Sequence, residues 1–349
     1  MSSARPIPPF PSDIPTADMV TVDFQELVKG DQNAAQAVYN AARGYGFFYM
    51  KNHQVDSNFM FGLADQVFRL PSEEKDRYDM GTTGGYFGYK RSGSQYVDKK
   101  GTPDHSEFYN VSKDDILRVG DKPPLAHPQP INEWRAELET FMRSCHAVVT
   151  VVLRALSAQL GLPPDALPSL HRIDRTGGDQ ARVTHAPPVD ESTITLGEHT
   201  DFGSVTVLFN QLGGLQVLTP NSREWRYVRP QPGCAVINLG DAVVKLVGGR
   251  LYSGVHRVMA PPGEQRECPR HSVVYFSRPN GDVLLKSLFG DSEKEQAVTA
   301  DEWIAKRAKL RNTANYKDEQ TFDASRGTEH HRERTGVGLG KPVREVEAM

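Results

Sequence analysis

Cysteine is scarce in this chain. The three cysteines, Cys145, Cys234 and Cys268, are widely spaced and form no Cys-x-x-Cys pair. A disulfide framework and a structural zinc knuckle are therefore both disfavoured. The simplest interpretation is that all three are small buried apolar side chains in a reducing compartment, which favours a cytoplasmic location.

Long apolar runs and an excess of charge of one sign are also missing. No run of 18 apolar residues occurs, so we expect no transmembrane helix, and the proline-rich N-terminus lacks the apolar core of a secretory signal. The 41 lysines and arginines against 44 aspartates and glutamates give a net charge of −3. This balance argues against nucleic acid or an anionic membrane surface as a partner.

The chain does contain enough apolar residues to bury a substantial core, 38% of its 349 residues. Its composition divides it into four parts: an extended proline-rich leader over 1–18, a mixed helical region over 19–175, a strand-rich core over 176–282, and a C-terminal helix with a charged tail over 283–349. The tail from residue 317 onward has few apolar residues, so we expect it to be partly disordered.

Apolar periodicity predicts the individual elements. A stripe at steps of three or four residues from Trp134 to Leu156 predicts a long core helix. Residues 80–130, rich in Gly, Ser, Asp, Lys and Pro, are predicted to form a long irregular connection. After residue 180, short β-branched segments alternate with turn residues, which predicts a β-sandwich or barrel. Further helices are expected over 33–43, 58–68, 72–78 and 299–311, and strands over 47–50, 204–209, 214–218, 234–238, 254–259 and 272–277.

The most informative segment is GEHTD at 197–201. In a strand, His199 and Asp201 would point to the same face and supply two ligands for a divalent metal. His256, in another predicted strand, is the candidate third ligand. Two histidines and a carboxylate form the facial triad of non-haem Fe(II) oxygenases, which leaves coordination positions open. For either histidine alone, a place in the core would be the favoured interpretation, but the combination with Asp201 favours metal ligation.

A second pair follows the distal histidine. Arg270 and Ser272 share one face of an apolar strand. A guanidinium binds a carboxylate through two parallel hydrogen bonds, and inside an apolar barrel it would be costly without a partner. A diacid bound to the metal at one end and to Arg270 at the other removes that cost. A structural salt bridge is the alternative for Arg270.

With these motifs in place, the sequence resembles the 2-oxoglutarate- and Fe(II)-dependent dioxygenases of the isopenicillin N synthase-like group. GEHTD resembles the metal-binding strand of that family, VHRV at 255–258 resembles its distal histidine segment, and Arg270-x-Ser272 resembles its motif for the distal carboxylate of 2-oxoglutarate. The likeness runs from about residue 20 to about residue 280, with the motifs in family order.

The resemblance implies an α+β fold: a double-stranded β-helix (jelly-roll) core with flanking helices and a mixed N-terminal region. It implies Fe(II) held by His199, Asp201 and His256, and 2-oxoglutarate as cosubstrate, held by Arg270 and Ser272. Its implied partners are a small organic substrate and dioxygen, and it predicts no particular oligomeric state. The implied reaction is oxidation of an unactivated C–H bond by hydroxylation, desaturation or cyclisation, in specialised metabolism.

One departure from the family pattern precedes the metal-binding strand. Family members often carry a tyrosine there that contacts the cosubstrate, and Ala186 stands at the corresponding position, with Thr184 or His185 as candidates to replace it. Two other functions stay open at this point. One is an Fe(II)- and dioxygen-dependent oxidase of the same fold that does not use 2-oxoglutarate, and the other is a jelly-roll binding protein without turnover.

Overall fold

The computed structural model describes residues 6–80, 86–220, 222–290, 297–311, 313, 316 and 318–327. Within them the strands are β1 (Thr21–Asp23), β2 (Phe47–Lys51), β3 (Gly88–Lys90), β4 (Glu107–Ser112), β5 (Gln180–Ala186), β6 (Ile194–His199), β7 (Val205–Asn210), β8 (Leu215–Leu218), β9 (Trp225–Tyr227), β10 (Cys234–Leu239), β11 (His256–Met259) and β12 (Arg270–Ser277). The helices are α1 (Phe24–Val28), α2 (Gln32–Arg43), α3 (Asn58–Arg69), α4 (Ser72–Asp76), α5 (Lys113–Leu117), α6 (Gln129–Glu133), α7 (Arg135–Gln159), α8 (Asp241–Leu246), α9 (Ala300–Leu310) and α10 (Glu319–Arg326), with 3₁₀ turns at Pro168–Leu170 and Gly263–Glu267.

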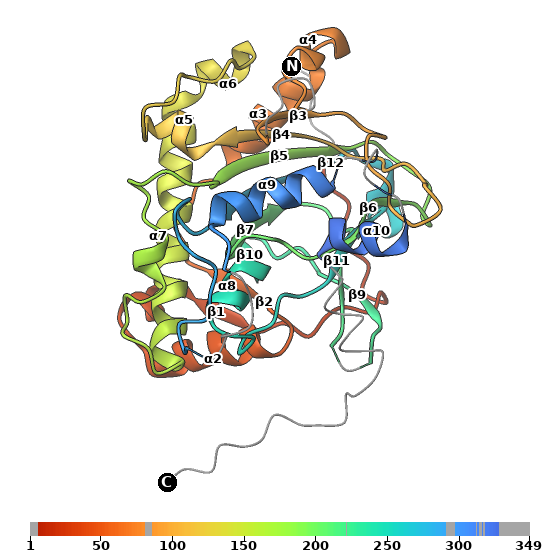
Figure 1. Cartoon of the computed structure of the whole chain (residues 1–349). Coiled ribbons are helices and arrows are strands. Elements are labelled where there is room, and N and C mark those ends of the chain that lie inside the picture. The colour runs from red at the N-terminus through yellow and green to blue at the C-terminus, as the bar shows by residue number, and fades with distance from the viewer. Residues whose placement is uncertain are drawn as a thin grey trace.

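The strands form two sheets (Figure 1). The larger has the order β1-β2-β10-β7-β12-β5-β4-β3 and the smaller has the order β6-β11-β8-β9. All pairings are antiparallel except that of β1 with β2. The two sheets make up the predicted jelly-roll core, so the expected α+β fold is confirmed. The larger sheet joins strands from both sides of the predicted boundary at residue 175.

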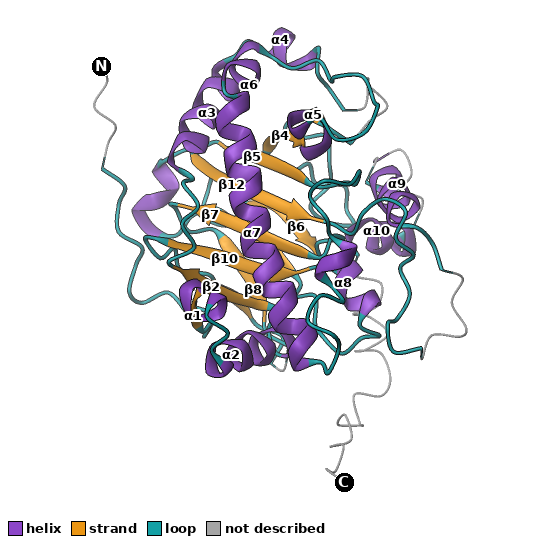
Figure 2. Cartoon of the chain, turned by 90° about the vertical axis from the view of Figure 1, so that its left-hand side faces the viewer, coloured by secondary structure: helices purple, strands orange, loops and turns teal. Residues whose placement is uncertain are grey.

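The predicted long core helix is α7, which crosses one face of the larger sheet (Figure 2). Its buried stripe, including Leu138, Phe141 and Leu153, packs against β5, β7 and β12. Among the described residues, α7 is the one helix long and apolar enough to cross a membrane by length and composition. Because its apolar stripe is buried against the sheet, we assign it to the protein core.

Replacing Leu153 with alanine tests that assignment. Leu153 is fully buried, at 0% exposure, so the substitution is expected to lower the free energy of unfolding by about 2–5 kcal/mol. Arg143→Ala is the matched control, because Arg143 lies on the exposed side of α7 and forms an ion pair with Glu139 at 2.8 Å. That control is expected to cost about 0.5 kcal/mol or less. Urea denaturation measures both, and equal losses would contradict the assignment.

The predicted irregular connection over 80–130 is wrong for β3, β4 and α5, which lie within it, and α6 begins at its end. Every residue of β4 is buried, and the strand pairs with β5 along its whole length. The sequence of β4 shows no alternation of polar and apolar residues, because both faces of the strand are covered and its polar residues have buried partners. Glu107, for example, accepts hydrogen bonds from Lys75 Nζ at 2.8 Å and from Tyr89 Oη at 2.5 Å.

Glu107 makes the stability of this region depend on pH. Burial alone would raise its pKa, but hydrogen bonds from His185, Lys75 and Tyr89 outweigh burial and lower the pKa from 4.5 to about 2. The ionised form therefore stabilises the fold fully above about pH 4.5, and this contribution is lost as the pH falls toward 2. In Glu107→Gln, the free energy of unfolding is expected to change less steeply over that range. Urea denaturation at several pH values measures it, with the exposed Glu224→Gln as control, and an unchanged slope would contradict the expectation.

The segment expected to be a disordered tail contains a helix in its described part. α10 packs against α9 and is capped by the side chain of Asp318 (Figure 1). At the C-terminal end of α10, the chain contacts Thr200, in the metal-binding segment. The carbonyl of Arg326 accepts a hydrogen bond from the Thr200 backbone N–H at 2.9 Å, and the carbonyl of Gly327 accepts one from Thr200 Oγ1 at 3.0 Å. The rest of the predicted tail, residues 328–349, lies outside the described residues.

Candidate active site

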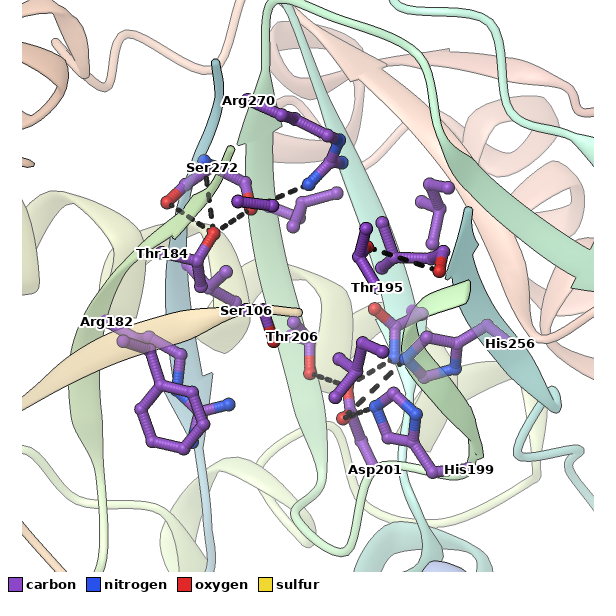
Figure 3. Close-up of a pocket in the computed structure, with 18 of the residues that line it drawn as sticks. Ser106, Arg182, Thr184, Thr195, His199, Asp201, Thr206, His256, Arg270 and Ser272 are labelled. Carbon is purple, nitrogen blue, oxygen red and sulfur yellow. Dashed lines mark hydrogen bonds and ion pairs between the residues drawn. The ribbon is translucent and has the colours of Figure 1, made fainter. Parts of the chain in front are cut away.

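A cavity lies inside the jelly roll, and both sheets contribute to its lining. The space that the centre of a water-sized sphere can occupy inside it is about 80 Å³. All five site residues predicted from the sequence line it: His199, Asp201, His256, Arg270 and Ser272 (Figure 3). The chain therefore brings together side chains from β6, β11 and β12.

The metal-binding triad is assembled by strand pairing. His199 ends β6, His256 begins β11, and the two are paired across the smaller sheet. Asp201 follows β6 by two residues. One ligand atom from each of the three buried side chains lies within 4.8 Å of the others. Asp201 Oδ1 is 4.0 Å from His199 Nε2 and 3.9 Å from His256 Nε2.

The remaining polar atoms of the triad are held by hydrogen bonds. His199 Nδ1 lies 2.9 Å from the carbonyl of Gly197, and His256 Nδ1 lies 3.1 Å from the carbonyl of Gly254. A carbonyl only accepts, so Nδ1 carries the proton in both rings, which leaves Nε2 free as a ligand.

Asp201 is oriented in the same manner. Its Oδ2 accepts hydrogen bonds from Thr206 Oγ1 at 2.6 Å and Asn238 Nδ2 at 2.8 Å, while Oδ1 faces the two histidines. Burial alone would raise the pKa of Asp201, but the neighbouring histidines and these two hydrogen bonds hold it below the ordinary value. Burial lowers the pKa of His199 well below its usual range. Asp201 is thus a carboxylate and His199 a neutral imidazole, the protonation states that metal binding needs. These residues fit Fe(II) as a facial triad.

The hydrogen bond from Thr206 to Asp201 gives a testable result. Thr206→Val removes that bond with little change in volume and is expected to weaken Fe(II) binding by about 10- to 100-fold. Thr206→Ser keeps the hydroxyl and is the matched control. Anaerobic titration with Fe(II) measures both affinities. Equal affinities in the valine and serine variants would show that the bond does not position Asp201.

Arg270 and Ser272 lie in the same cavity at a distance from the triad (Figure 3). Arg270 donates from Nε to the carbonyl of Gly213 at 2.6 Å and from Nη1 to Ser272 Oγ at 3.3 Å. Burial lowers the pKa of Arg270 to about 10, so it remains a cation at neutral pH. No acidic side chain among the described residues pairs with it, so the salt-bridge alternative finds no partner.

The residues around Ala186 lie beside this pair. Ala186 is opposite Arg270 in the strand register, and Thr184 is opposite Ser272. Thr184 Oγ1 is 2.5 Å from Ser272 Oγ. The other candidate, His185, is instead engaged with Glu107 Oε1 at 2.9 Å. Of the two polar side chains near Ala186, Thr184 is therefore the one in contact with Ser272.

One cavity residue was not identified from the sequence. Arg182 lies on β5 between the rings of Phe108 and Phe276. The available signal was its place in the ARVTHA segment, where Arg182, Thr184 and Ala186 alternate along one face of a strand.

Fold and site together define a non-haem Fe(II) oxygenase that uses 2-oxoglutarate, and two family models match the chain. Residues 177–279 match the 2OG-Fe(II) oxygenase superfamily, and residues 14–137 match the non-haem dioxygenase in morphine synthesis N-terminal family. The chain belongs to the 2OG-Fe(II) oxygenase superfamily and is an Fe(II)- and 2-oxoglutarate-dependent oxygenase.

Individual relatives support this membership over most of the chain. The 2-oxoglutarate-dependent dioxygenase frbH of a Dothideomycetidae species is 31% identical, over 83% of this chain and 89% of its own. Naringenin,2-oxoglutarate 3-dioxygenase of Callistephus chinensis is 29% identical, over 85% and 82%. The crystal structure of a full-length Neurospora crassa protein in complex with alpha-KG and thymine is similar with a TM-score of 0.72 and 26% identity, covering 83% of this chain and 96% of that one.

Proposed function

We propose that this oxygenase oxidises an unactivated C–H bond of a small organic molecule of specialised metabolism in the cytoplasm, with hydroxylation as the default outcome. We further propose that Arg270 and Ser272 hold the far carboxylate of 2-oxoglutarate. The observation that carries this is a buried, unpaired Arg270 in the same cavity as the triad. Such a cation needs an anionic partner, and a diacid that reaches the metal provides one.

Fe(II) with 2-oxoglutarate and dioxygen supplies oxidative decarboxylation to succinate and carbon dioxide, coupled to oxidation of the substrate. The protein contributes position and exclusion of water. Arg270 is held by the Gly213 carbonyl, so that Nη1 and Nη2 can face a carboxylate. Thr184 and Ser272 supply hydroxyls beside it. Apolar side chains such as Leu208 and Val258 line the remainder and limit water.

The small-molecule assignment is supported by the enclosed cavity and by the relatives. The name of one relative specifies naringenin, and another was crystallised with thymine. These two molecules differ in size and chemistry, so the relatives support a small organic substrate without selecting one. The free cysteines are consistent with a reducing compartment.

Succinate release tests the proposal directly. The purified chain with Fe(II), 2-oxoglutarate and dioxygen is expected to form succinate, with an increase when a substrate from a metabolite panel is added. Under anaerobic conditions, Fe(II) and 2-oxoglutarate together are expected to give a visible metal-to-ligand absorption band that is absent in His199→Ala. Substrate oxidation without succinate would instead indicate an oxidase that does not use the cosubstrate.

A further inference from the structure

Arg182 is a second arginine in the cavity without an acidic partner. Its residue exposure is 7%, and its guanidinium carbon lies 3.8 Å from the ring centroid of Phe108 and 4.8 Å from that of Phe276. Its Nε donates to Asn110 Oδ1 at 2.7 Å. Nη1 and Nη2 donate no hydrogen bond to the described residues and form no ion pair with them. Two of the three guanidinium nitrogens are therefore free to bind a ligand.

The surroundings of Arg182 do not balance its charge. Burial lowers its pKa to about 10, so it stays positive at neutral pH, and the nearby Arg278 and Arg311 add further positive charge. Stacking on two aromatic rings offsets part of the desolvation cost. It leaves the terminal donors unsatisfied, and each such donor is costly when buried.

A count of charges in the loaded site leaves Arg182 unmatched. The two positive charges of the metal are balanced by Asp201 and by the near carboxylate of 2-oxoglutarate, and Arg270 is balanced by the far carboxylate. Asp201 is the one acidic side chain among the described residues that line this cavity. One more negative charge is needed, and the substrate is the component still to be added.

The strand register separates Arg182 from the cosubstrate. On β12, Arg270 is opposite Ala186, and Val274 is opposite Arg182 of β5. The strand positions of the two arginines therefore differ by four residues, about 13 Å at strand spacing. In Figure 3, Arg182 lies at the left at about the height of the triad, and Arg270 lies toward the top. Arg182 and the three triad residues line the same cavity. A cosubstrate held between Arg270 and the metal therefore leaves Arg182 available.

We propose that Arg182 binds a carboxylate of the molecule that is oxidised and thereby orients the rest of that molecule toward the metal. This inference rests on the proposed function, because it takes Arg270 as the anchor of 2-oxoglutarate. Phe108 and Phe276 hold the guanidinium plane in place, and the apolar lining receives the body of the substrate. The substrate class is a small carboxylic acid with an apolar body.

The test uses the full chain with Fe(II) and 2-oxoglutarate under anaerobic conditions, where substrate binding perturbs the visible absorption band. The probes are two matched pairs, phenylacetate with phenylacetamide and hexanoate with hexanamide, and thymine as a neutral ring. The carboxylates are expected to perturb the band at concentrations at least about 30-fold lower than their amides. Arg182→Met is expected to abolish that preference, and Arg182→Lys to keep part of it.

The controls separate this inference from the function on which it rests. Arg229→Met removes another arginine stacked on a phenylalanine, Phe10 at 4.7 Å, outside the cavity lining, and is expected to behave like the unsubstituted chain. Formation of the band in Arg182→Met shows that this variant folds and binds metal and cosubstrate. No band in the unsubstituted chain would overturn the proposed function and this inference with it.

If the band forms, three results would overturn the role of Arg182 alone. The first is that amides or thymine perturb the band as strongly as the carboxylates do. The second is that neither carboxylate perturbs it at millimolar concentration. The third is that Arg182→Met responds to the carboxylates as the unsubstituted chain does.

Discussion

Asp201→Ala is expected to lower 2-oxoglutarate turnover by about 1,000-fold and to remove tight Fe(II) binding. The substitution deletes the one anionic ligand of the triad, and stabilisation of several kcal/mol by a bound metal corresponds to about three orders of magnitude in rate. It also leaves Thr206 and Asn238 without their common acceptor. Succinate formation and anaerobic Fe(II) titration measure the two effects.

Two comparisons make the Asp201 result specific. Asp201→Glu keeps the charge but moves it by one methylene, so it is expected to retain weak metal binding with low turnover. Asp190→Ala changes an aspartate that is exposed and outside the triad and is expected to retain both properties. Turnover in Asp201→Ala within tenfold of the unsubstituted chain would show that the metal is held elsewhere.

Arg270→Ala is expected to weaken 2-oxoglutarate binding by about 30-fold or more, because it removes the buried cation that would face the far carboxylate. The effect should appear in the KM for 2-oxoglutarate and in the concentration needed to form the anaerobic band. Fe(II) affinity without cosubstrate is expected to stay unchanged, because Arg270 forms no hydrogen bond with the triad. Weaker 2-oxoglutarate binding with unchanged Fe(II) affinity would distinguish loss of the cosubstrate anchor from misfolding of the site.

Arg270→Lys and Arg266→Ala complete the Arg270 series. Lysine keeps the charge without the planar fork and is expected to recover part of the affinity. Arg266 is a nearby exposed arginine that pairs with Glu191 and Glu267 at the surface, so its removal is expected to have no effect on 2-oxoglutarate binding. An unchanged KM in Arg270→Ala would refute the anchor and favour another holder for the far carboxylate.

The triad was predictable from the sequence because its geometry is mostly local. His199 and Asp201 are two residues apart, and strand alternation predicts that they share one face, although β6 ends at His199. His256 was less certain from spacing alone, since its place opposite His199 depends on the register of β6 with β11. The family order of the motifs supplied that missing long-range information.

Arg182 and β4 were not predictable by the same reasoning. β4 carries no alternation, because both of its faces are buried and its charged residue Glu107 has partners from distant segments. The proposed role of Arg182 rests on the lack of an acidic partner among the described residues. That lack can be recognised only in the three-dimensional structure. α10 was missed for a third reason: its composition is polar, and its buried residues include Asp323, Ser325 and Arg326.

The contact between residues 326–327 and Thr200 has a consequence for the order in which the enzyme is completed during synthesis. Thr200 separates two metal ligands, yet its backbone N–H finds its partner only at Arg326. Gly327 must remain glycine for this approach, because its φ is +72° and an added Cβ would lie 2.2 Å from Thr200 Oγ1. During synthesis, more than one hundred further residues must therefore be added after Thr200 before its backbone N–H can form this hydrogen bond.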